Sequence, residues 1–143
     1  MPILPKTPRE LFVYGTLMSA SKSGLGSTMR RRLARASVRL GGATVKGRLY
    51  DLGGYPGLVP SDAGRDLVAG ELIRLHNADQ VFRWLDAYEG IGDGHELPHA
   101  YERKVCDVRL TRGPRVAAWI YLYRLSTSGC ARIRSGNWLS PCH

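Results

Sequence analysis

The 143-residue chain matches one ordinary domain, and its 43% hydrophobic and 23% charged residues exclude an intrinsically disordered chain. Its longest apolar stretches, such as residues 116–122, are far shorter than the roughly 20 residues of a transmembrane helix, so we expect no membrane span. A formal net charge of +9 would favour nucleic acid, an anionic membrane or an acidic small molecule as partner.

The first half of the chain predicts a strand, a helix and a bent extended region. Residues 11–14 form a short apolar run that ends at Gly15, which is typical of a buried strand entering a tight turn. Ser27 is a candidate N-terminal cap for a helix that continues through Leu33 and Ala34. Glycine pairs and a proline then interrupt the extended pieces 38–40, 45–50 and 57–59, which indicates a coiling sheet.

Arginines cluster on and after the predicted helix, and they account for much of the unusual charge. We expect them to coat a solvated helix, because no group of aromatic side chains accompanies them to stack bases. Nucleic acid is therefore not an expected partner, despite the positive charge. The cluster consists of Arg30, Arg31, Arg32, Arg35 and Arg39.

The second half predicts a strand, a helix and a hairpin. Residues 67–75 alternate in part between apolar and polar side chains and indicate a strand. Apolar residues at helical spacing predict a helix over 78–89, with Gly90 as its C-terminal cap. Residues 101–110 and 115–125 predict a hairpin, and the tail from 126 is expected to be irregular. Many strands with only two helices between them predict an α+β fold with a mostly antiparallel or mixed sheet.

The chain ends and the cysteines suggest a cytoplasmic protein. Three prolines within residues 1–8 do not fit the apolar helix of a signal peptide. Three cysteines without a CxxC spacing indicate neither a disulfide framework nor a zinc knuckle. We expect one domain over residues 1–143, with flexible ends at 1–8 and 139–143.

Two short segments carry candidate chemistry. Tyr14, Gly15, Thr16 and Leu17 follow the first strand, where successive backbone N–H groups can form a nest for a carboxylate or an oxyanion. Glu89 ends the second helix, where the helix dipole is negative and would raise the pKa of its carboxyl group. Such a carboxylate suits a base that can also hold a proton. We interpret Asp86, three residues earlier, as a solvated or capping charge.

Six motifs occur in one order across nearly the whole chain, and together they resemble the γ-glutamylcyclotransferase-like family. Each motif is unspecific by itself, whereas their joint order and spacing carry the resemblance. They are Phe12-Val13-Tyr14-Gly15-Thr16-Leu17, the stretch from Gly47 to Leu58 that includes Leu52-Gly53-Gly54-Tyr55-Pro56-Gly57, Val68-Ala69-Gly70-Glu71-Leu72, Leu85-Asp86-Ala87-Tyr88-Glu89-Gly90, Tyr101-Glu102-Arg103 and Ile133-Arg134-Ser135-Gly136-Asn137-Trp138.

This resemblance implies a small mixed β-barrel with flanking helices and a cyclising enzyme without a cofactor. The implied reaction is intramolecular aminolysis: the α-amine of a γ-glutamyl compound attacks its own γ-carbonyl and releases 5-oxoproline and an amine. Glu89 would be the general acid and base, and the loop from Tyr14 to Leu17 would hold the glutamyl part. Tyr101 and Tyr121 are additional pocket candidates, although tyrosines on a strand are commonly half-buried packing residues.

Several alternatives stay open. The same pocket could belong to a non-catalytic module that binds an amino-acid-like metabolite, and neither the leaving group nor the oligomeric state can be read from these motifs. His95 and His99 are four residues apart, but Gly94 and Pro98 argue against a helical metal site, so we expect no metal. Cys142 and His143 lie at the end of the chain, where a catalytic pair would lack rigid support.

Overall fold

The computed structural model describes residues 7–18, 21, 26–92, 94 and 97–140. His95 and the Cys142-His143 pair therefore lie outside the described residues, as do most of the ends for which flexibility is predicted. The elements in chain order are β1 (Glu10–Val13), α1 (Ser27–Arg35), β2 (Ser37–Lys46), β3 (Arg48–Asp51), β4 (Pro56–Val59), β5 (Leu67–Leu75), α2 (Ala78–Tyr88), β6 (Tyr101–Leu110), β7 (Arg115–Tyr123) and β8 (Ala131–Ile133).

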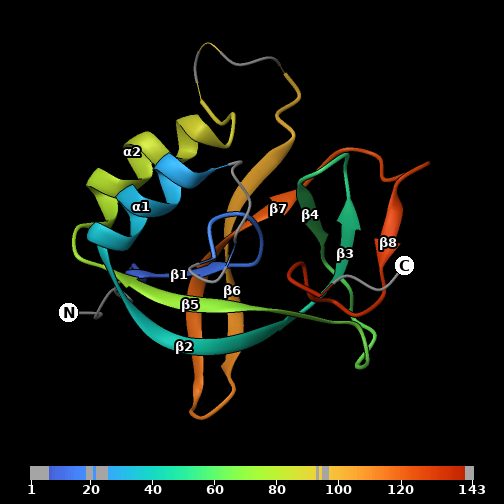
Figure 1. The fold of residues 1–143 in the computed structure, drawn as a ribbon, viewed down its shortest axis with the longest axis horizontal. Helices are drawn as coiled ribbons and strands as arrows, with labels where there is room; N and C mark the ends of the chain where they lie inside the picture. The colour runs from blue at the N-terminus through green and yellow to red at the C-terminus, as the bar shows by residue number, and fades with distance from the viewer. Residues whose placement is uncertain (1–6, 19–20, 22–25, 93, 95–96, 141–143) are drawn as a thin grey trace, which may run out of the picture.

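Five strands close into a barrel in the order β1-β5-β2-β6-β7 (Figure 1). The neighbouring pairs are antiparallel except β1 and β7, which run parallel and meet at Leu11 and Trp119. Side chains such as Phe12, Leu72 and Ile120 are buried together in the barrel core. The predicted α+β class, a small mixed barrel with flanking helices, is confirmed.

A second, three-stranded sheet has the order β4-β3-β8. The prediction of an irregular tail from residue 126 onward is wrong for β8. This strand pairs antiparallel with β3 and places Ile133 opposite Leu49. This strand has only three residues, and of these only Ile133 is buried. Because so short a strand carries no alternating pattern, its pairing depends on the neighbour that tertiary structure supplies.

Asp66 ties the small sheet to the barrel, immediately before β5. Its carboxylate accepts hydrogen bonds from Arg48 Nε at 2.6 Å, Ser61 Oγ at 2.7 Å and Arg132 Nη2 at 2.8 Å. These three donors hold the pKa of Asp66 well below its usual value, with Arg48 contributing most. A buried carboxylate with this set of partners is a structural cross-link.

Three predicted boundaries in the first half are wrong. β2 is continuous where two pieces were expected, because a register shift between Arg39 and Gly41 absorbs the glycine pair. The strand expected over 45–50 is divided at Gly47, where the chain passes from β2 in the barrel to β3 in the smaller sheet. The N-cap of α1 is Gly26, with φ of 76°, so Ser27 is the first helical residue instead of the cap.

The helix α2 follows its prediction closely and packs on the barrel. The Asn77 side chain accepts a hydrogen bond from the Gln80 N–H, and Gly90 follows the helix with φ of +78°. The buried residues of α2 are Val81, Phe82 and Leu85. Neither α1 nor α2 is long and apolar enough to cross a membrane.

The helix α1 lies beside α2 (Figure 1), and the Arg32 guanidinium sits 4.3 Å from the centre of the Trp84 ring. Only Leu33 of α1 is buried, and Arg31, Arg32 and Arg35 are exposed. The interpretation of a solvated basic helix therefore holds for these three. Arg30 differs, because its Nη1 donates a 2.6 Å hydrogen bond to the carbonyl oxygen of Thr16.

Candidate active site

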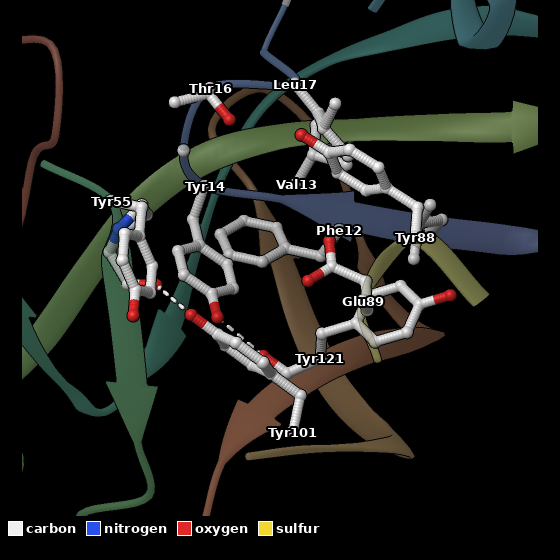
Figure 2. Close-up of a pocket in the computed structure, with 13 residues that line it drawn as sticks. Phe12, Val13, Tyr14, Thr16, Leu17, Tyr55, Tyr88, Glu89, Tyr101 and Tyr121 are labelled. Carbon is white, nitrogen blue, oxygen red and sulfur yellow. Dashed lines mark hydrogen bonds between the residues drawn. The ribbon is translucent and has the colours of Figure 1, made fainter. Parts of the chain in front are cut away.

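A pocket of about 320 Å³ lies where the end of β1 approaches the C-terminal end of α2 (Figure 2). Most of its wall is aromatic or aliphatic, and among the described residues that line it only Glu89 has a carboxyl group. The lining residues are Leu11, Phe12, Val13, Tyr14, Gly15, Thr16, Leu17, Tyr55, Pro56, Tyr88, Glu89, Tyr101 and Tyr121. All seven residues predicted for the site thus meet in one pocket.

Packing and hydrogen bonds both hold the loop after β1 in place. A Cβ on Gly15 would overlap Cγ of Pro56, so the glycine is required by a close approach of β4 to the loop. Arg30 donates a hydrogen bond to the Thr16 carbonyl, and the Met18 N–H donates one to the Gly15 carbonyl at 3.0 Å. Binding of an anion by the loop amides stays a prediction.

Glu89 is the C-cap residue of α2, and its backbone N–H donates to the Leu85 carbonyl. Its half-buried side chain turns into the pocket toward Tyr14 and Tyr101 (Figure 2). Burial, together with a smaller contribution from the nearby charge of Asp86, raises the pKa of Glu89 to about 7. The direction agrees with the prediction. Its causes are burial first and Asp86 second, where sequence reasoning invoked the helix dipole.

The hydroxyl groups of two tyrosines in the pocket donate hydrogen bonds to backbone carbonyls. The Tyr14 hydroxyl donates to the Tyr121 carbonyl at 2.6 Å, and the Tyr101 hydroxyl donates to the Pro56 carbonyl at 2.7 Å. Burial raises the pKa of both phenols, and Glu89 adds to the effect on each. Since each phenol donates its only proton to the protein, the two oxygens face the pocket as hydrogen-bond acceptors.

Asp86 lies behind the pocket, and its carboxylate accepts hydrogen bonds from two other side chains. The interpretation of Asp86 as a solvated or capping charge is therefore wrong. Its Oδ1 accepts a hydrogen bond from the Tyr121 hydroxyl at 2.6 Å. Arg103 donates from Nε to Oδ1 at 2.8 Å and from Nη2 to Oδ2 at 3.1 Å. In the sequence, the signal that Asp86 lies near the site was its i, i+3 spacing from Glu89, because residues at this spacing lie on the same face of a helix.

Sequence reasoning also missed two tyrosines at the mouth of the pocket. Tyr88 precedes Glu89, and burial raises its pKa while a hydrogen bond with the Thr16 side chain lowers it. Tyr55, on the turn before β4, lines the opposite side (Figure 2). Both residues are 40% or more exposed. The signal for Tyr55 was its place in a long glycine-rich motif, although only folding brings that motif to β1.

Of the two histidines of the loop after α2, only His99 belongs to the described residues. Within the described residues, no three side chains of His, Cys, Asp or Glu come together in a way that could hold a metal ion. His99 lines a separate hollow with Asp86 and Arg103, outside the Glu89 pocket. Its Nε2 is buried and has no hydrogen-bond partner in the described part of the chain.

The closed mixed barrel, with the Glu89 carboxylate facing an aromatic pocket, places the chain in a class of small mixed-barrel proteins. A family model described as gamma-glutamyl cyclotransferase, AIG2-like, matches residues 11–140. The chain belongs to this gamma-glutamyl cyclotransferase family, as its motifs indicated.

Relatives and solved structures agree with this assignment. The chain is 33% identical over 129 residues to the gamma-glutamylcyclotransferase family protein YtfP of Escherichia coli K12, covering 90% of this chain and 95% of that protein. The solution structure of ytfP from Escherichia coli has 32% sequence identity and a TM-score of 0.59 over 91% of this chain and 96% of that one. YkqA from Bacillus subtilis has a TM-score of 0.65 and 25% identity, over 92% of this chain and 40% of YkqA.

Proposed function

We propose that this protein is a γ-glutamyl cyclotransferase-type enzyme that releases 5-oxoproline and an amine or amino acid from a γ-glutamyl compound. The observation that carries the proposal is Glu89, a carboxylate with a pKa of about 7 that faces a pocket of about 320 Å³. A general base is most effective when its pKa lies near the working pH. The volume suits a small amino-acid derivative.

In the proposed reaction, one bond forms and one breaks within the same γ-glutamyl group. The α-amine nitrogen attacks the γ-carbonyl carbon while the Glu89 carboxylate takes a proton from that nitrogen. The tetrahedral intermediate then expels the leaving amine, whose nitrogen receives the proton from Glu89. Electrons and protons balance without a redox partner, so the step itself calls for no cofactor.

The pocket supports this sequence of events through position and charge. Ring closure already has both reacting groups in one molecule, so the protein needs to hold the reactive conformer. The loop of Tyr14, Gly15, Thr16 and Leu17 would hold the glutamyl carboxylate with backbone N–H groups, and the acceptor oxygens of Tyr14 and Tyr101 would receive N–H groups of the amine. Tyr121 contributes its ring to the wall and its carbonyl to Tyr14.

The second candidate is a binding module that recognises the same kind of metabolite without converting it. The well-braced loop and the aromatic wall would serve such a module equally well. The two functions differ in one observable: a module binds γ-glutamyl compounds and leaves them intact.

The experiment measures release of 5-oxoproline from γ-glutamyl amino acids, γ-glutamyl amines and glutathione. Wild-type protein is compared with Glu89→Gln, which keeps the size of the side chain and removes the base. Glu102→Gln is the matched control, because Glu102 is a partly exposed carboxylate on β6 that pairs with Lys104 and Arg124 and lines no part of the pocket. Release by the wild type and the control but not by Glu89→Gln supports the enzyme. Binding without release by any of them favours the module, and equal release by all three contradicts the role of Glu89.

A further inference from the structure

The guanidinium of Arg103 occupies a closely packed position behind the candidate active site. It lies 3.8 Å from the centre of the Phe82 ring and 4.3 Å from the centre of the Trp119 ring, and it binds Asp86 through two hydrogen bonds. The side chains of the Arg103–Asp86 pair are 22% and 24% exposed, compared with 70% and 66% for the surface pair Arg115–Asp107. A bidentate, aromatic-backed arginine is much more restrained than an exposed ion pair.

Asp86 connects this arginine to the pocket along two routes. Its Oδ1 accepts the proton of the Tyr121 hydroxyl, and Tyr121 lines the pocket. Asp86 also lies three residues before Glu89, so the two carboxylates emerge on the same side of the last turn of α2. The negative charge that Glu89 meets therefore belongs to a side chain whose position is set by Arg103.

We infer that Asp86 and Arg103 are positioning residues of the candidate active site: Arg103 fixes the Asp86 carboxylate, and Asp86 fixes the Tyr121 hydroxyl and the charge beside Glu89. The inference rests on the proposed acid/base function of Glu89. Neither residue lies against the substrate space, because the pocket lining includes Tyr121 and Glu89 but not Asp86 or Arg103. Their influence on the reaction is indirect.

The ionisable groups around Glu89 come from four parts of the fold. Their charges determine in which direction a substitution shifts the pKa of Glu89. Asp86 contributes a negative charge and Arg103 a positive one, while the phenols are neutral at ordinary pH, since their pKa is about 10 even in water and burial raises it. His99 lines a separate hollow together with Asp86 and Arg103. These groups are Asp86 and Tyr88 on α2, Tyr14 after β1, Tyr101 and Arg103 on β6, and Tyr121 on β7.

The test uses two single variants with opposite expected signs. Asp86→Asn removes a negative charge, so the pKa of Glu89 should fall and the acid limb of the kcat/KM profile should move to lower pH by about one pH unit. Arg103→Met keeps an apolar stem between the two rings but leaves the Asp86 charge unbalanced, so the limb should move to higher pH. The Glu89 carboxyl is followed independently by ¹³C NMR titration, with its signal assigned by its absence in Glu89→Gln.

Two further variants separate charge from packing. The double variant Asp86→Asn with Arg103→Met removes both charges, so its Glu89 titration should return close to that of the wild type. Arg103→Lys keeps the charge and should also titrate like the wild type, even if the loss of the guanidinium fork lowers kcat. Arg74→Met is the control for losing an arginine, because Arg74 pairs with Glu10 at the start of β1 and lines no part of the pocket.

Opposite shifts in the two single variants, with none in Arg74→Met, establish the positioning role. Shifts of the same sign, or no shift in either variant, overturn the inference even if the wild type is an active cyclotransferase. If Arg103→Met does not fold, Asp86→Asn and Arg103→Lys still predict a shift and no shift respectively. If the wild type releases no 5-oxoproline, the proposed function fails, while the NMR titrations still decide whether Asp86 and Arg103 govern Glu89.

Discussion

Asp66 and Glu89 are both carboxylates withdrawn from solvent, yet their surroundings are opposite. Asp66 receives hydrogen bonds from Arg48, Ser61 and Arg132, and the pKa of its carboxyl is held well below the usual range. Glu89 receives no side-chain hydrogen bond from the described residues, and burial raises its pKa to about 7. Burial by itself therefore does not decide what a carboxylate does. The donors around it decide whether it anchors the fold or can exchange a proton near neutral pH.

The contrast predicts first that activity depends on only one of the two carboxylates. Glu89→Gln should lower kcat/KM by about 10²- to 10⁴-fold, which is the usual contribution of a positioned acid/base group. Asp66→Asn should leave kcat/KM of the folded fraction little changed, because Asp66 lies outside the pocket. Steady-state kinetics on the best substrate of the panel measures both values. A comparable loss in the two variants would contradict the division of roles.

The second prediction concerns stability against pH at Glu89. Its pKa of about 7 in the folded protein lies above the roughly 4.3 of an unfolded glutamate, so the folded protein binds the extra proton between these values. Stability due to this group is therefore fully present below about pH 4 and is lost as the pH rises to about 7. The difference in unfolding free energy between wild type and Glu89→Gln should change by on the order of 3 kcal/mol across that range. Urea unfolding at several pH values measures it, and a constant difference would show that Glu89 is not perturbed.

The third prediction has the opposite sign and concerns Asp66. Its pKa is depressed in the folded protein, so its stabilisation is present above the unfolded value of about 3.9 and is lost as the pH falls through the folded value. Asp66→Asn should lower the Tm at neutral pH by several degrees, because Arg48 and Arg132 lose the negative charge of their common partner and one of its two acceptor oxygens. Thermal unfolding measures this change. Asp62→Asn, an exposed neighbour, is the matched control and should melt like the wild type.

The smallest expected effect is that of Arg48→Met. Arg48 is about half exposed, and Asp66 keeps Ser61 and Arg132 as donors when Arg48 is removed. The Tm should therefore fall by less than in Asp66→Asn, and the pH profile of activity should not move. The same melting and kinetic assays apply. A shift in the acid limb of kcat/KM would mean that the two carboxylates are coupled across the barrel.

Most of the regular elements could be predicted locally, because their apolar residues recur at helical or strand spacing. The helix α2 is the clearest example, since Asn77 and Gly90 mark its ends and three of its apolar residues are buried. β8 and the single strand β2 could not be predicted in this way. β8 depends on β3 for its hydrogen bonds, and β2 crosses its glycine pair because β5 continues beside it.

The chain by itself determined the family, the α+β class and the seven residues that meet in the pocket, because ordered motifs and local periodicity survive without knowledge of distant contacts. Only the tertiary structure decided which charges meet. Asp86 contacts Arg103 and Tyr121 from separate strands, and Gly15 meets Pro56 across about forty residues of chain. Perturbed carboxylates arise from burial and from such distant partners, so the environment of Glu89 follows from how the barrel closes and not from its local sequence.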